Sequence, residues 1–246
     1  MGTPRLTPAD AARYGKDGYL LYHEPVFSPE KFARLTSIFE EHLAGIGTAR
    51  TDTLDTPHFR DARLLDFLLD EQVLDLVEPL IGPDIGLWSS HFISKEPKIG
   101  RATPWHKDAD YWESRFETFT GIVTVWLAID RTDKGNGCMR VIPGSHHAKS
   151  GEYVPVDTQT NTFETELANV DEGKAVYFEL LPNECSLHDS RLVHGAAANT
   201  SDRRRCGYTM RYFSQQMRYI TDAPGNQRHH LWHARGRNPH NNPVRN

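Results

Sequence analysis

Two histidines, one aspartate and one arginine in this sequence have the types and spacing needed for metal-dependent chemistry. His106 and Asp108 lie two positions apart, His194 follows 88 residues after His106, and Arg205 lies eleven residues beyond His194. Two imidazoles and one carboxylate on one face of an iron leave coordination positions open, which is the ligand set of non-haem Fe(II) oxygenases. A metal does not require the arginine, but a guanidinium binds a carboxylate through two parallel bonds, so Arg205 would suit a dicarboxylate co-substrate.

The spacing of these residues also constrains the elements that carry them. In a β-strand, residues i and i+2 point to the same side, so His106 and Asp108 are expected to reach one metal from one strand. His194 follows a candidate strand at 186–193, and folding has to bring the two segments together. No cysteine lies in the motif to favour a structural zinc site. The HxD pair is a weak signal by itself, because chance matches are frequent, and the distant histidine and arginine make the pattern much stronger.

Composition and charge argue against several classes of protein. The chain has 246 residues, of which 38% are hydrophobic and 25% charged, as in an ordinary soluble globular protein. Its net charge of −5 gives no indication of nucleic-acid binding. The three cysteines are widely spaced and do not resemble a disulfide framework, so a reducing, cytoplasmic compartment is expected. No apolar run has the length of a transmembrane helix and no signal peptide is evident, so no membrane association is expected.

Helical periodicity precedes the strand patterns along the chain. Helices are predicted at 7–16, from Ser28 onward and at 62–80, with a strand at 18–22 and a loop at 46–60. Short apolar runs separated by Gly, Pro, Asn and Asp clusters then predict strands at 86–95, 121–130, 138–142, 174–180, 186–194 and 206–215. This order favours an all-β core, a jelly roll or barrel, with a helical layer packed on it.

The last part of the chain differs in composition from the rest. We assign residues 1–217 to one domain and treat 218–246 as a basic, histidine-rich extension of it. The extension has few apolar residues, which favours a surface tail, with a subunit contact or a cover for the active site as alternatives.

Several segments together resemble the phytanoyl-CoA dioxygenase family of Fe(II)/2-oxoglutarate-dependent oxygenases. The resemblance covers residues 7–215 and includes the stretches 95–97, 103–112, 125–130, 136–146 and 188–205. It implies a mainly β fold with flanking helices, in which a double-stranded β-helix (jelly-roll, cupin-like) core carries an N-terminal helical layer. It also implies Fe(II) as the metal, with 2-oxoglutarate and O2 as co-substrates.

The resemblance assigns roles to individual residues. It implies that His106, Asp108 and His194 bind the iron and that Arg205 binds the distal carboxylate of 2-oxoglutarate. The neighbouring Arg203 and Arg204 leave the register of that anchor open. The other residues expected to bind the co-substrate are Trp126, for which a purely core role is the alternative, His91 and Lys95. Two positions depart from the family pattern, because Ala196 replaces a common serine and Lys107 a common glutamine.

The expected reaction is hydroxylation of an unactivated C–H bond, with release of succinate and CO2. Halogenating relatives carry a small residue at the position of Asp108, so the carboxylate here favours hydroxylation. Arg140, Trp112 and Arg211 are candidate contacts of a small, polar or anionic substrate, although both arginines would also suit structural ion pairs. Alternatives are a zinc- or nickel-dependent hydrolase or isomerase and a non-catalytic binding protein. The sequence does not decide between a monomer and a homo-oligomer.

Overall fold

Five α-helices are present in the part of the chain that the computed structural model describes, residues 5–46, 54–112 and 114–246. They are α1 (Pro8–Asp17), α2 (Pro29–Gly45), α3 (Leu65–Leu68), α4 (Glu71–Ile81) and α5 (Asp108–Tyr111). The side chains of Thr7 and Ser28 accept hydrogen bonds from backbone N–H groups and so begin α1 and α2, as the sequence predicts. The loop predicted at 46–60 lies partly outside the described residues.

The helix predicted at 62–80 is divided into separate helices. A short 3-10 turn (Ala62–Leu64) leads into α3, which ends at Leu68, and α4 starts at Glu71. The Asp70 side chain accepts a hydrogen bond from the backbone N–H of Gln72 and caps the start of α4. The hydrophobic period passes through this boundary, but the cap sets a new helix direction.

The strands form two main sheets and one small hairpin. The large sheet has the order β1-β9-β4-β11-β2-β12-β13, the second sheet has the order β3-β10-β5-β8, and β6 pairs with β7. The strands are β1 (Tyr19–Tyr22), β2 (Ile85–Lys95), β3 (Thr103–His106), β4 (Ile122–Ala128), β5 (Met139–Val141), β6 (Tyr153–Pro155), β7 (Thr165–Leu167), β8 (Val176–Tyr177), β9 (Cys185–Asp189), β10 (His194–Ala196), β11 (Arg205–Ser214), β12 (Leu231–Arg235) and β13 (Val244–Arg245).

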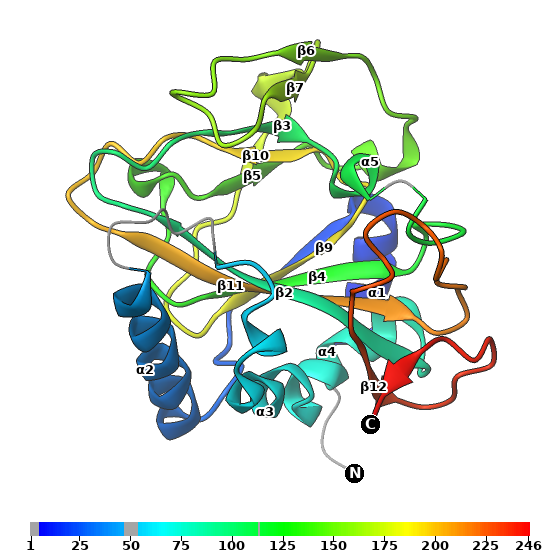
Figure 1. The fold of residues 1–246 in the computed structure, drawn as a ribbon. Helices are drawn as coiled ribbons and strands as arrows, with labels where there is room; N and C mark the ends of the chain where they lie inside the picture. The colour runs from blue at the N-terminus through cyan, green and yellow to red at the C-terminus, as the bar shows by residue number, and fades with distance from the viewer. Residues whose placement is uncertain (1–4, 47–53, 113) are drawn as a thin grey trace.

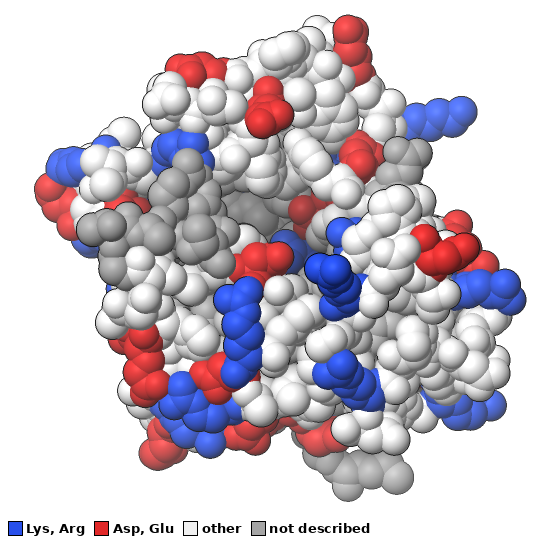
Figure 2. Space-filling model, in the orientation of Figure 1, with Lys and Arg blue, Asp and Glu red and all other residues white. Residues whose placement is uncertain are grey.

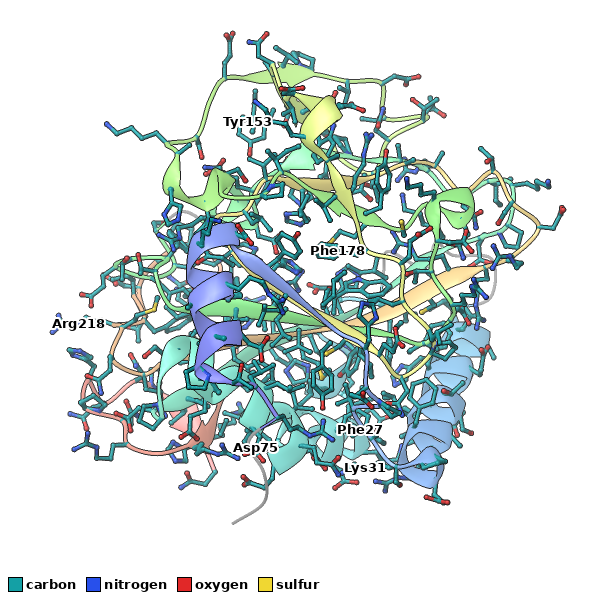
Figure 3. All side chains as sticks on the ribbon, turned by 180° about the vertical axis from the view of Figure 1, so that it is seen from behind. Phe27, Lys31, Asp75, Tyr153, Phe178 and Arg218 are labelled. Atoms are coloured by element: carbon teal, nitrogen blue, oxygen red, sulfur yellow. The ribbon has the colours of Figure 1, made fainter. Side chains whose placement is uncertain are left out.

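The two main sheets pack face to face as a jelly roll, and helices α2, α3 and α4 cover the outer face of the large one (Figure 1). Strand β4 shows how the sequence produces these layers. Val123, Val125 and Leu127 belong to the core shared with the helices, whereas Trp126 and Ala128 pack with Val141 and Phe178 of the second sheet. Figure 3 shows Phe178 in the space between the sheets. Alternate residues of one strand therefore serve two cores.

The strand predicted at 186–194 is in fact two strands in different sheets. Strand β9 ends at Asp189, whose side chain accepts a hydrogen bond from the backbone N–H of Arg191 and forms a turn. The chain then crosses to the second sheet, where His194 begins β10 between β3 and β5. This crossing places His194 beside the segment that carries His106.

The segment after residue 217 is packed against the body of the protein, so the preference for a surface tail is wrong. Strand β12 pairs with β2, and Leu231 and Trp232 are buried. Arg235 forms ion pairs with three carboxylates on α4, those of Glu71, Asp75 and Glu78. Arg235 therefore complements the acidic side chains of α4. None of the described helices combines the length and the apolar character needed to cross a membrane.

Candidate metal centre and its cavity

The two histidines of the sequence motif lie directly opposite each other on neighbouring strands. His106 on β3 is the antiparallel partner of His194 on β10, and the centroids of their rings are 4.1 Å apart. Nδ1 of His106 lies 2.8 Å from the carbonyl oxygen of Pro104, and Nδ1 of His194 lies 2.9 Å from that of Leu192. A carbonyl can only accept, so both Nδ1 atoms carry the proton and both Nε2 atoms keep a lone pair.

Asp108 completes the cluster from the first residue of α5. Its Oδ1 atom lies 3.5 Å from Nε2 of His106 and 3.9 Å from Nε2 of His194, and the ligand atoms of all three side chains lie within 4.8 Å of one another. The expectation that one strand carries both His106 and Asp108 is wrong, because β3 ends at His106. Lys107 still has extended backbone (φ −112°, ψ 130°), so the side chains of residues 106 and 108 point to the same side.

The electrostatics of the cluster suit a divalent cation. Burial raises the pKa of Asp108, but its close contacts with His106, Arg211 and His194 outweigh this effect and hold the pKa of this carboxyl well below its usual range. Burial and the neighbouring His106 lower the pKa of His194 well below its usual value. The cluster therefore presents one carboxylate and two imidazole nitrogens whose lone pairs converge, and no cysteine belongs to it. These donors fit Fe(II).

The cluster opens into a cavity of about 1070 Å³ between the two sheets. Figure 2 shows this face of the molecule hollowed near its centre, with basic and acidic side chains around the opening. Polar side chains from the large sheet form one part of the lining, namely Ser89, Thr124, His188, Thr209 and Arg211. Aromatic rings form another, namely Trp88, Tyr111, Trp112, Trp126 and Phe163. The ring of Phe163 lies edge-on to that of His106, with the centroids 4.8 Å apart.

Arg205 lies at the start of β11 with its side chain in the wall of the same cavity. Its Nε and Nη2 atoms donate to the carbonyl oxygen of Gly137, at 3.0 and 2.8 Å, and its guanidinium carbon lies 5.3 Å from the centre of the Trp126 ring. Burial lowers the pKa of Arg205 to about 10, so the group is a buried cation at neutral pH. Its Nη1 atom has no hydrogen-bond partner among the described residues, which leaves donors for an anionic ligand.

Comparison with known proteins places this site in a family. The model of the phytanoyl-CoA dioxygenase family matches residues 14–207, a range that contains all four residues of the motif. The chain belongs to the phytanoyl-CoA dioxygenase family.

Family members with curated descriptions are distant from this chain. A phytanoyl-CoA dioxygenase domain-containing protein 1 homologue of Caenorhabditis elegans is 28% identical over 160 residues, covering 62% of this chain and 55% of the relative. A probable alpha-ketoglutarate-dependent hypophosphite dioxygenase of Stutzerimonas stutzeri is 27% identical over 204 residues, covering 74% and 70%. The chain spans about half the length of the phytanoyl-CoA dioxygenase relatives that it matches.

Solved structures show that the fold is shared. EvdO2 from Micromonospora carbonacea var. aurantiaca, complexed with 2-oxoglutarate, superposes with a TM-score of 0.72 at 21% identity, covering 92% of this chain and 97% of that one. The carbocyclase SnoK from nogalamycin biosynthesis gives a TM-score of 0.73 at 23% identity, with 92% of each chain covered.

The two arginines before Arg205 lie outside the cavity of this family member. Arg203 pairs with Asp133 at 2.6 Å and is exposed. Arg204 pairs with Asp130 and Glu40, both at 2.8 Å. Of the three consecutive arginines, only Arg205 contributes to the cavity wall.

The other three residues expected to bind the co-substrate all line the cavity, but they differ in their contacts with the rest of the protein. Trp126 lines the cavity and also packs in the core between the sheets, so it satisfies both interpretations. Lys95 lines the cavity, but its ammonium group donates to the backbone carbonyls of Arg101, Ala196 and Ala197. These contacts tie β2 to the backbone near Arg101 and to the end of β10, and they use all three N–H donors of the Lys95 ammonium group. His91 lines the cavity with Nδ1 at 3.8 Å from Oδ1 of Asp55, and its role stays a prediction.

Of the three candidate substrate residues, two line the cavity and one does not. Arg140 does not line the cavity, so the geometry does not support its assignment as a substrate contact. It pairs with Glu172 at 2.6 Å and stacks over the ring of Trp105, which is the structural ion pair that the sequence left open. Arg211 and Trp112 do line the cavity, and the guanidinium carbon of Arg211 lies 5.2 Å from the centre of the Trp112 ring.

Two further positions matter to the site and were not singled out from the sequence. Gly207 pairs with Ala128 of β4 and packs against the Trp126 ring, and a Cβ atom at position 207 would be 2.1 Å from Cζ2 of the indole. Glycine is thus required for the ring to pack against β11 at this position. Thr124 is almost fully buried and lines the cavity. The available signal was a threonine at an inward-pointing position of the otherwise apolar segment Ile122–Ala128.

Proposed function

We propose that this protein is an Fe(II)- and 2-oxoglutarate-dependent dioxygenase that hydroxylates a C–H bond of a small, polar or anionic molecule. The observation that carries the proposal is that one cavity contains both a His-Asp-His cluster and a buried arginine with free donors. The ligand atoms of the cluster lie within 4.8 Å of one another. In the overall reaction, R–H, 2-oxoglutarate and O2 give R–OH, succinate and CO2. One oxygen atom enters the product and the other enters succinate.

The roles of the residues follow from their contacts. Nε2 of His106, Nε2 of His194 and a carboxylate oxygen of Asp108 would hold the iron, and the carbonyls of Pro104 and Leu192 fix the orientation of the two rings. When bound, the iron supplies O2 activation coupled to decarboxylation of 2-oxoglutarate. The protein itself supplies orientation and a site sheltered from water between the sheets.

Arg205 is suited to orient 2-oxoglutarate. Its Nε–Nη2 edge is held by the carbonyl oxygen of Gly137, so the guanidinium is fixed before any ligand binds. The remaining donors can form charge-assisted bonds with the distal carboxylate of the co-substrate, and the Trp126 ring lies against the same group. Ala196 replaces a serine that is common in the family, which removes one donor and leaves the arginine as the main anchor.

The alternatives explain fewer of these features. A hydrolase or isomerase with the same metal ligands has no need of a buried arginine with free donors in the cavity. A non-catalytic member of the fold would be expected to lack a ligand, whereas all three ligands are present and converge. The carboxylate of Asp108 would fill the ligand position that halogenating relatives leave free for a halide, and so favours hydroxylation.

The test is production of succinate by the purified protein supplied with Fe(II), 2-oxoglutarate and O2 across a panel of small acids and polar metabolites. Asp108→Asn should abolish succinate formation. Asp110→Asn is the matched control, since this carboxylate two residues away accepts hydrogen bonds from Ser150 and Tyr153 and lies outside the metal cluster. Equal activity of the two variants, or no succinate from the folded wild-type protein with Fe(II), would contradict the proposal.

A further inference from the structure

A row of polar side chains crosses the large sheet on the face that lines the cavity. Arg211 on β11 is the direct partner of Ser89 on β2 and of Thr124 on β4, and Thr124 is in turn the partner of His188 on β9. Direct partners in antiparallel strands point to the same face. All four side chains line the cavity. Four adjacent strands therefore place one polar residue each in a single line, beside the metal cluster.

Three polar groups of this row have no hydrogen-bond partner among the residues that the structure describes. Oγ1 of Thr124, Nδ1 of His188 and Nε of Arg211 are buried without a hydrogen-bond partner among the described residues. The exposed fractions of Thr124 and His188 are only 1% and 2%. Buried polar atoms are paired in the great majority of cases, so three unpaired neighbours in one row indicate a missing polar ligand.

Arg211 has the donors to bind such a ligand. Its contacts with described residues are an ion pair to Asp108, with Nε at 3.8 Å from Oδ2, and the face of the Trp112 ring. It makes no hydrogen bond to any residue that the structure describes, in contrast to Arg205 in the same cavity. A separation of 3.8 Å is too long for a charge-assisted hydrogen bond, so Asp108 does not use these donors.

We propose that Arg211, Thr124 and His188 form an oxyanion subsite that holds the acid group of the substrate. This inference rests on the proposed function, and it narrows the substrate class to small molecules with a carboxylate, phosphonate or phosphinate group. Arg211 supplies the charge and paired N–H donors, while the hydroxyl of Thr124 and the imidazole of His188 supply neutral hydrogen bonds. The contact between Arg211 and Asp108 places the acid group next to the metal ligands.

The subsite is separate from the anchor for 2-oxoglutarate. Arg205 and Arg211 are six residues apart on β11, which corresponds to about 20 Å of strand. The two cations lie on the same face of β11, with Gly207 and Thr209 between them. The cavity thus offers two separate cationic positions, one for the distal carboxylate of the co-substrate and one for the acid group of the substrate.

The test measures binding of small acids to the anaerobic protein loaded with Fe(II) and 2-oxoglutarate. The probes are propanoate, butanoate, methylphosphonate and hypophosphite, and the neutral controls are propanamide, butanamide and dimethyl methylphosphonate. Binding is read from the change that each probe causes in the visible absorption of the Fe(II)–2-oxoglutarate complex. At least one acid should bind the wild-type protein, and its neutral counterpart should bind much more weakly.

Substitutions identify the group responsible. Arg211→Met should weaken binding of that acid by roughly 30-fold, as expected for loss of hydrogen bonds from a charged donor, and leave the affinity for 2-oxoglutarate unchanged. Arg211→Lys should restore part of the loss, because it restores the charge. Arg140→Met is the matched control, because the Arg140 side chain is similarly buried, 17% exposed against 12% for Arg211, but lies outside the cavity. It should leave acid binding unchanged.

Four results would overturn the subsite. In the first, the wild-type protein forms the 2-oxoglutarate complex but binds none of the acids; in the second, it binds acids and neutral analogues equally well. In the third, Arg211→Met binds the acid as tightly as the wild-type protein does. In the fourth, Arg211→Met loses affinity for 2-oxoglutarate or Fe(II). The last result would make Arg211 a co-substrate contact or a positioning residue for Asp108. Failure of the wild-type protein to form the 2-oxoglutarate complex would instead contradict the proposed function itself.

Discussion

Replacement of Arg205 by methionine should weaken 2-oxoglutarate binding far more than it weakens the fold. Arg205 is 2% exposed, and two of its guanidinium nitrogens donate to the carbonyl oxygen of Gly137. The remaining donors can form two bonds to a carboxylate, and bonds to charged groups contribute about 1.5–3 kcal/mol each. Loss of both bonds, roughly 3–6 kcal/mol, corresponds to an increase of about 100- to 10,000-fold in the concentration of 2-oxoglutarate required.

The assay is the rate of succinate release as a function of 2-oxoglutarate concentration, with thermal unfolding recorded for each variant. Arg205→Lys keeps the charge and loses the paired geometry, so it should give an intermediate increase in KM. Arg204→Met is the control, because Arg204 is the adjacent residue in the chain but pairs with Asp130 and Glu40 outside the cavity. An unchanged KM in Arg205→Met, or an equal increase in Arg204→Met, would refute the assignment of the anchor.

Three further predictions concern the scaffold around the site. Burial and the nearby His229 and His230 lower the pKa of His58 from about 6.5 to about 3, so stability is full above pH 6.5 and falls as the pH drops through this window. The loss between pH 7 and pH 5 should be about 2 kcal/mol in urea unfolding, and His58→Gln should remove most of it. Gly207→Ala should destabilise the fold by about 1–3 kcal/mol and raise the KM for 2-oxoglutarate, because the new methyl group displaces Trp126. A variant with the stability and the KM of the wild-type protein would contradict the packing of Trp126 against Gly207. We propose that 218–246 is an extension of the same domain, so Leu231→Ala, at a fully buried position, should cost about 2–5 kcal/mol in the same unfolding assay. A loss below about 1 kcal/mol would argue that the extension folds independently of the body.

The sequence was sufficient to predict the metal cluster because its residues are either close together in the chain, as His106 and Asp108 are, or lie on paired strands, as His106 and His194 do. The side chains of His106 and Asp108 point to the same side wherever the backbone between them is extended, even though the strand itself stops at His106. The family resemblance favoured Arg205 as the anchor but left its register open, and the role of Arg205, which is buried, stays a prediction. The jelly-roll core was predicted in the same way, from short strands with turn residues between them.

Features that depend on contacts between distant parts of the chain could not be predicted from the sequence pattern. Arg140 and Arg211 look equivalent in the sequence, but Glu172 holds one outside the cavity and Trp112 lies against the other inside it. The crossing between β9 and β10 follows a short polar run, Asp189-Ser190-Arg191, which is too brief for periodicity alone to divide the predicted strand. The C-terminal segment is polar in composition, yet one apolar pair, Leu231 and Trp232, is enough to add it to the sheet.

The most direct test of the central claim is an anaerobic titration of the purified protein with Fe(II) and 2-oxoglutarate, followed by visible absorption. A co-substrate that chelates an iron held by two imidazoles and one carboxylate should give a weak charge-transfer band at about 500 nm. We expect the band in the wild-type protein at one iron per chain, and its loss in His194→Ala with the fold retained. Absence of the band in folded wild-type protein, or its persistence in His194→Ala, would contradict the account.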